Sequence, residues 1–189
     1  MFDKNKVDIS SGALLVAEPY MDDPNFRRSV VLLCEHHKEG SLGFILNKPL
    51  GMPVSSLLSG FPDFNAEIFY GGPVQTDTIH YVHNKGDLIE DSVEISQGVF
   101  WGGSYEQLKF CVQNELILPF DIKFFVGYSG WGEGQLVEEL EIFSWMQIAT
   151  DKNYIFCSSD ISKNLWKTVL ENEGDVKSVI AQMQIPNWN

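Results

Sequence analysis

The residues with the clearest potential for chemistry lie in one glycine-rich stretch, Gly127 to Gln135, with the sequence GYSGWGEGQ. Ser129 follows an apolar segment and precedes a helical pattern, where α/β-hydrolases place a nucleophilic serine in a Gly-x-Ser-x-Gly turn. Trp131 occupies the position of the second glycine, and the last histidine of the chain, His83, precedes Ser129 instead of following it. These departures favour a turn hydroxyl over a nucleophile.

The same glycines suggest an anion site, because successive backbone N–H groups at a helix N-terminus attract phosphate. Glu133 lies inside the stretch, however, and Glu138, Glu139 and Glu141 follow it in the expected helix. Their carboxylates neighbour the positive end of that helix and would repel a phosphate. We therefore interpret the stretch as a tight strand-to-helix turn.

Two large aromatic residues, Tyr128 and Trp131, lie on this turn. Each ring combines an apolar body with a polar group, so it suits either core packing or contact with a ligand. Burial is the commoner outcome, but the surrounding glycines would let a ligand approach the backbone closely. The hypothesis that follows is a turn that lines a pocket.

The histidines offer little for metal binding. His36 and His37 are adjacent and His80 and His83 are three apart, so on strands each pair would point to opposite faces. Cys34 and His36 would share a face, but a zinc site needs about four donors and no others are suggested nearby. We expect neither a metal site nor a cofactor.

Further polar candidates lie in the first quarter of the chain. Glu35 and His36 close an apolar run, where they could act as an acid/base pair only if a substrate were held beside them. Asp23 and Arg28 could form a functional ion pair, although a structural contact within the loop is the default interpretation.

The elements that would position these residues are strands and helices in mixed order. The expected strands span residues 13–17, 29–35, 42–47, 67–70, 78–83, 93–95, 99–101, 122–126 and 145–149. The expected helices span 54–58 and 105–116, and three more carry apolar positions 136/140/143, 161/165/169 and 176/179/180/183. Residues 104–107 predict a capping box, and Asp160 predicts the cap of a later helix. Strands that mostly precede helices and are joined by short loops favour an α+β fold.

Size and charge limit the function classes. With 189 residues and 44% hydrophobic composition, the chain should form one domain over residues 1–189 that buries roughly 70% of its unfolded surface. Its net charge is −13, from 26 acidic and 13 basic residues. Direct nucleic-acid binding is disfavoured, because that binding depends on Lys and Arg displacing counterions from phosphates.

Cysteine usage and hydropathy address the compartment. The three cysteines are far apart and odd in number, which indicates a reducing environment. The longest apolar run is far too short to span a bilayer, and the N-terminal residues are polar. The sequence therefore predicts a cytoplasmic protein without a membrane segment.

Taken together, two groups of motif residues resemble those of the YqgE/AlgH family across nearly the whole chain. They are Met21, Asp23, Pro24, Phe26, Arg28, Ser29, Val30, Glu35, His36, Gly40, Gly43, Asn47, Pro49, Gly71, Gly72, Pro73, Val74, His83, Gly127, Tyr128, Gly130, Trp131, Gly134, Gln135, Leu136 and Trp145. The resemblance implies an α+β fold with a mixed, branched β-sheet and a small barrel-like core surrounded by helices. Family members are described as proposed transcriptional regulators, with no established activity, cofactor or catalytic residue. Two departures are Ser129, where the family often has alanine, and residues 102–121.

The leading hypothesis is a cytoplasmic, non-enzymatic regulatory or binding protein that acts indirectly, through protein or small-ligand contacts. Its expected binding residues are Asp23, Arg28, Glu35, His36, Asn47, His83, Tyr128, Trp131 and Gln135. One alternative is a hydrolase- or transferase-type enzyme that uses His36 or His83 with Glu35 or Asp23. A second is a direct DNA-binding regulator, which the net charge disfavours.

Overall fold

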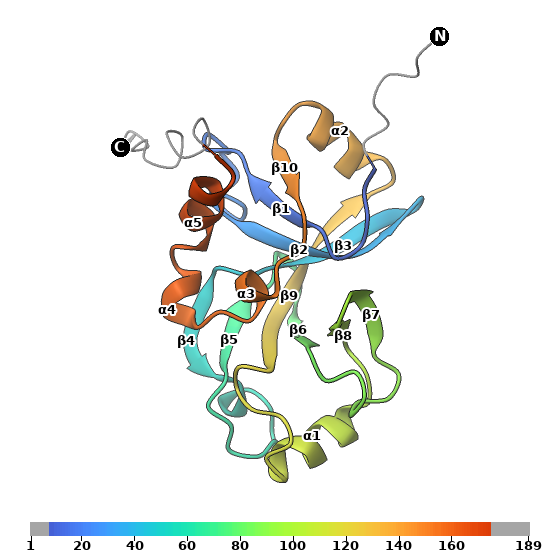
Figure 1. Ribbon diagram of the computed structural model, residues 1–189, viewed down its shortest axis with the longest axis vertical. Coiled ribbons are helices and arrows are strands. Elements are labelled where there is room, and N and C mark those ends of the chain that lie inside the picture. Colours follow the sequence, from blue (N-terminus) through green and yellow to red (C-terminus); the bar gives the residue numbers. More distant parts are fainter. Residues whose placement is uncertain (1–7, 175–189) are drawn as a thin grey trace.

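Strands dominate the fold of residues 8–174, which are the residues that the computed structural model describes (Figure 1). The strands are β1 (Leu14–Ala17), β2 (Val30–His37), β3 (Gly40–Ile45), β4 (Pro49–Pro53), β5 (Glu67–Tyr70), β6 (Val74–His83), β7 (Val93–Ser96), β8 (Val99–Trp101), β9 (Ile122–Gly132) and β10 (Trp145–Ile148). The helices are the 3-10 turn η1 (Val54–Ser56), α1 (Tyr105–Gln113), α2 (Gln135–Glu141), α3 (Lys152–Ile155), α4 (Ser159–Ser162) and α5 (Leu165–Asn172).

The ten strands form one branched sheet whose main path runs β10-β1-β2-β3-β9-β6-β8-β7. The first half of β9 pairs in parallel with β5, at residues 124–126, and its second half pairs with β3, at residues 129–132. β4 extends the β5 branch. The α+β class and the mixed, branched sheet are therefore confirmed. Among the described strands, however, no pairing joins β10 to β7, so the sheet is not closed into a barrel.

β9 does not end where the sequence predicted. The glycine stretch was expected to be a turn, but β9 continues through Gly132 and leaves only two residues before α2. The strand continues because β3 supplies a partner for it, with Ser129 opposite Gly43 and Trp131 opposite Ser41. Glycine at position 71 lets the backbone approach Gly127 of this stretch closely, because a Cβ on Gly71 would lie 2.3 Å from the Gly127 carbonyl oxygen.

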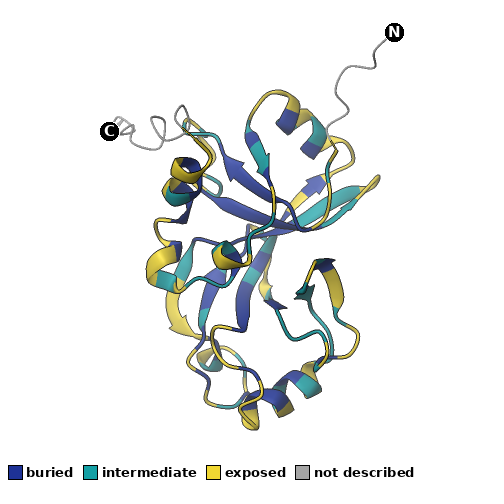
Figure 2. Ribbon diagram, viewed as in Figure 1, coloured by how far each residue is buried: buried dark blue, intermediate teal, exposed yellow. Residues whose placement is uncertain are grey.

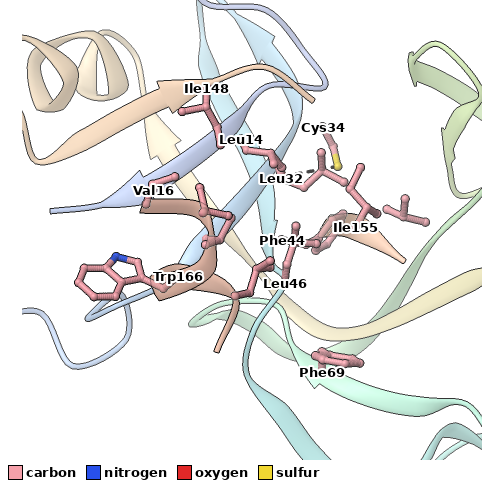
Figure 3. Packing of buried hydrophobic residues seen from close by; sticks show 14 of the residues in the cluster. Leu14, Val16, Leu32, Cys34, Phe44, Leu46, Phe69, Ile148, Ile155 and Trp166 are labelled. Atoms are coloured by element: carbon pink, nitrogen blue, oxygen red, sulfur yellow. Dashed lines mark hydrogen bonds between the residues drawn. The ribbon is translucent and has the colours of Figure 1, made fainter. Parts of the chain in front are cut away.

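The core lies on both faces of the β1–β2–β3 layer, because side chains alternate along a strand. On one face Leu14, Leu32 and Phe44 pack with Trp166 of α5, as Figure 3 shows. On the other face Leu15, Val31, Leu33 and Ile45 pack with Trp131, Trp145 and two leucines of α2. A separate cluster joins α1 to β5, β6 and β9. Figure 2 shows β1 and most of β2 buried, whereas β3 and β9 are buried along only part of their length.

Two of the helix predictions need correction. The predicted helix over 105–116 ends at Gln113, and its capping box is one-sided, because Gln107 Oε1 accepts from the Glu90 amide instead of the Ser104 amide. The helix expected after Asp160 is two helices, α4 and α5, and Ser158 is the N-cap residue of the first. The helix expected after Gly174 lies outside the described residues. None of the described helices is long and apolar enough to cross a membrane.

Candidate functional site

The structure divides the nine predicted binding residues among separate places. Glu35, Tyr128 and Trp131 line one hollow of about 410 Å³ at the β3–β9 pairing, which we call the motif hollow. His36 lies on β2, opposite Ser41 of β3, and its Nδ1 is 2.7 Å from the Ser41 hydroxyl oxygen. Glu35, His36 and Tyr128 therefore stay predictions for contact with a ligand or partner.

Trp131 and Gln135 belong to a hydrogen-bonded network around Glu139 of α2. One carboxylate oxygen of Glu139, Oε2, accepts from the indole N–H of Trp131 at 2.9 Å and from that of Trp145 at 2.7 Å. The other oxygen accepts from the Gln135 amide at 2.8 Å, while Gln135 Oε1 accepts from the Gly132 backbone N–H at 2.9 Å. Trp131 is only 5% exposed. These contacts give Trp131 and Gln135 a structural role in fastening α2 to β9.

Asn47, Arg28 and Asp23 organise the loop that precedes β2. The Asn47 side chain accepts from the Val30 amide at 2.9 Å and donates to the Arg28 carbonyl at 2.8 Å. Arg28 has a φ of 51°, in the left-handed region, so the two Asn47 bonds hold an unfavourable turn in place. Asp23 Oδ1 accepts from the Asn25 amide within the same loop. The buried amide of Asn47 is thus committed to the backbone.

His83 is fully buried at the far end of β6. Its Nδ1 accepts from the Lys85 amide at 3.2 Å, and its Nε2 therefore carries the hydrogen that is donated to the Gly102 carbonyl at 3.0 Å. Burial lowers the pKa of His83, while the bond to Gly102 opposes that shift. Both ring nitrogens of His83 are hydrogen-bonded to backbone groups, which gives His83 a structural role.

His36 and His83 cannot serve one active site. His83 is opposite Ile122 of β9, whereas His36 is opposite Ser41, which is opposite Trp131 at the other end of β9. Nine positions along a strand separate Ile122 from Trp131, or about 30 Å. The two histidines therefore share no cleft, and an enzyme that uses one of them is left with His36, because both ring nitrogens of His83 bond to backbone groups. Within residues 8–174 no cluster of His, Cys, Asp and Glu could hold a metal ion.

The larger cavity lies away from the motif residues, between the β4–β5 branch, the start of β9 and the segment that joins α3 to α4. It has a volume of about 500 Å³. We call it the Lys123 cleft, and it is lined by Gly51, Met52, Pro53, Asn65, Ala66, Glu67, Phe69, Pro119, Phe120, Ile122, Lys123, Phe156, Cys157, Ser158 and Ser159. This volume falls within the range of small-molecule sites.

Lys123 is the unusual residue of this cleft. It is only 4% exposed, and its ammonium donates to the Leu46 carbonyl oxygen at 3.1 Å and lies 4.1 Å from the centre of the Phe69 ring. Burial lowers its pKa from 10.5 to about 8, against the opposing influence of Cys157 and Glu67. An ammonium has three N–H donors. One is used by Leu46, and no second acceptor for the ammonium is found in the described part of the chain.

Two other polar groups of the cleft are already hydrogen-bonded. Glu67 Oε1 accepts from the Gly51 amide at 2.7 Å, and the Cys157 thiol lies 3.2 Å from the Tyr154 carbonyl oxygen. Ser158 is the N-cap residue of α4, yet its side chain makes no capping bond. The cleft therefore combines apolar walls with one buried cation that retains hydrogen-bonding capacity.

Sequence reasoning missed this site, although a signal for it exists. Lys123 interrupts the apolar segment 122–126, which was expected to be a strand. A lysine in such a segment must leave the core, find a partner or line a cavity, because a buried charge without a partner is costly. A lysine inside an apolar strand is therefore the feature of the sequence that indicates this site.

The mixed, branched sheet with its helices places the chain among α+β proteins, and comparisons with known proteins identify its family. The AlgH-like family model matches residues 14–177. A UPF0301 protein of Chlorobium limicola is 40% identical over 189 residues, covering 100% of this chain and 98% of that protein. Another, from Cytophaga hutchinsonii, is 36% identical over 178 residues, covering 94% of this chain and 97% of that protein. The chain belongs to the AlgH-like family.

Two solved structures share the fold. A crystal structure of a Corynebacterium diphtheriae protein has a TM-score of 0.77 at 19% identity, covering 96% of this chain and 95% of that one. The solution structure of the AlgH protein from Pseudomonas aeruginosa has a TM-score of 0.71 at 26% identity, covering 97% of this chain and 100% of that one. The family predicted from motif residues is thereby confirmed. The names of these relatives state no reaction or ligand.

Proposed function

We propose that this protein is a cytoplasmic, non-enzymatic regulatory protein that responds to a small ligand bound in the Lys123 cleft. The observation that carries the proposal is Lys123, a buried lysine that lines a cavity of about 500 Å³ and whose ammonium donates one hydrogen bond to the protein, to the Leu46 carbonyl. A ligand that presents an oxygen acceptor would accept from the other N–H groups of that ammonium.

The energetic cost of Lys123 supports a functional role. Desolvating an ammonium is unfavourable, and the lowered pKa of Lys123 reports that cost. A methionine or leucine would fill the same strand position without this desolvation cost. Buried charged groups in cavities are enriched at functional sites. Such a group lowers the stability of the fold, so it is retained where ligand binding needs the charge.

Indirect regulation fits the charge of the chain better than direct DNA contact. At a net charge of −13, the protein would be repelled by phosphate backbones. Cys34, Cys111 and Cys157 are free thiols, in keeping with the reducing compartment that the proposal assumes. Any influence on transcription would pass through ligand binding or protein contacts.

A blocking variant tests the proposal. We expect small apolar molecules that carry a carboxylate, amide or hydroxyl group to shift backbone NMR signals of cleft residues, foremost Glu67 and Lys123. Ser158→Trp should abolish those shifts, because the indole would occupy the cleft at an exposed position that makes no capping bond. Asp160→Trp, two residues away and outside the lining, is the matched control and should leave them intact.

The proposal fails if no molecule of such a panel shifts the cleft signals. It also fails if Ser158→Trp leaves every shift unchanged, since binding would then occur elsewhere.

A further inference from the structure

We infer that the Lys123 cleft selects a monocarboxylate with a compact apolar body; this inference rests on the proposed function and specifies its ligand class. The ammonium of Lys123 supplies the only positive charge among the lining residues, and Glu67 supplies the only carboxylate. The ligand would provide the hydrogen-bonded anionic partner that the buried cation does not have among the described residues.

Charge limits the ligand to one negative unit. Lys123 can neutralise a single carboxylate through a charge-assisted hydrogen bond. A phosphate monoester carries close to two negative charges at neutral pH and would meet the repulsion of Glu67 without a second cation in the lining. The cleft therefore disfavours phosphorylated ligands.

Hydrogen bonding separates a carboxylate from neutral analogues. Lys123 donates one bond, to Leu46, so its remaining N–H groups can reach one or both oxygens of a carboxylate. An amide of the same shape offers one carbonyl oxygen and no charge, and it leaves the buried ammonium without an anion.

The walls define the rest of the ligand. Phe69, Phe120, Ile122 and Phe156 line the cleft together with Met52. Such surfaces bind an aromatic ring or a short aliphatic chain by excluding water from it. A polar or charged tail would gain little from them.

The pH dependence of binding should follow Lys123, because only its protonated form pairs with an anion. The charged and titratable groups that influence it are Glu67 of β5 and Cys157 of the α3–α4 segment, and both raise its pKa against the effect of burial. Carboxylate binding should therefore be full below about pH 8 and should be lost as the pH rises through that value.

The test compares benzoate with benzamide, which is neutral and nearly the same shape. Titrations followed by the NMR signals of cleft residues should give benzoate a Kd at least about tenfold lower than that of benzamide at pH 6.5. At pH 9.5 benzoate binding should weaken by about tenfold or more, because only the protonated fraction of Lys123 binds.

Three variants complete the test. Lys123→Met should remove the preference for benzoate, whereas Lys38→Met, at the exposed β2–β3 turn, should keep it. Glu67→Gln, which retains an acceptor for the Gly51 amide, should strengthen benzoate binding about threefold at pH 6.5, because it removes the opposing charge.

The outcomes separate the two proposals. Equal binding of benzoate and benzamide, or benzoate binding that Lys123→Met leaves unchanged, would overturn the carboxylate inference while the cleft remained a ligand site. Shifts confined to the motif hollow would overturn the carboxylate inference and the proposed cleft together.

Discussion

Replacing Lys123 with methionine is expected to stabilise the folded protein by about 3 kcal/mol at pH 7. Burial lowers the pKa of Lys123 from 10.5 to about 8, and each unit of such a shift corresponds to roughly 1.4 kcal/mol. Methionine has a similar length and no charge, so it should occupy the position between Ile122 and Phe124 without the desolvation cost. Urea unfolding measures the difference.

The sign of the pH effect provides a second check. Between about pH 8 and pH 10.5 the unfolded chain binds the Lys123 proton and the folded protein does not, so wild-type stability should rise with pH there. Lys123→Met lacks this contribution, and its advantage should shrink across the same window. Lys38→Met, at an exposed turn, should stay within about 0.5 kcal/mol of wild type throughout. Parallel pH curves for Lys123→Met and wild type would contradict the account.

Replacing Glu139 with alanine is expected to cost about 3 kcal/mol of stability. Its Oε2 accepts from the indole N–H groups of both Trp131 and Trp145, which are 5% and 2% exposed. Without Glu139 two buried donors lose their acceptor, and each such loss costs roughly 1–3 kcal/mol. Urea unfolding followed by tryptophan fluorescence reports on stability and on the local environment together.

Glu138→Ala is the matched control for this prediction. Glu138 is the preceding residue of α2 and is exposed, so its removal should change stability by no more than about 0.5 kcal/mol. If the two alanine variants unfold at the same urea concentration, the glutamate of the network has no special role.

The Glu139 network explains what the glycine motif is for. Its tryptophan, its glutamine and a glutamate four residues further on form one set of contacts that joins β9 to α2. From the sequence, Trp131 could be identified as important but not as a network member. Glu139 is contributed by a helix whose rotation about its axis is fixed by packing against β3, β9 and β10.

Local patterns located most of the strands, because continuous apolar runs such as Val30 to Cys34 demand burial on both faces. They could not show which strands pair. The continuation of β9 through Gly132 depends on β3, which is about ninety residues earlier in the chain. Because the sequence does not reveal this pairing, the glycines of residues 127–134, which are typical of turns, were predicted to form a turn.

The binding residues illustrate the same limit. Asn47 and His83 are polar residues in apolar surroundings, which made them candidates for function, but their partners are backbone groups that only the folded chain brings to them. Lys123 was passed over although its setting is equally apolar. What separates it from them is the cavity beside it, and cavities arise from tertiary packing.

The most direct test of the central claim is an NMR titration of the Lys123 side chain, with its signal assigned by its loss in Lys123→Met. We predict a titration midpoint near pH 8 in the free protein and a higher midpoint with benzoate, because an anion favours the protonated ammonium. A midpoint near the ordinary lysine value of about 10.5, unmoved by benzoate, would contradict both the buried ammonium and its role in binding.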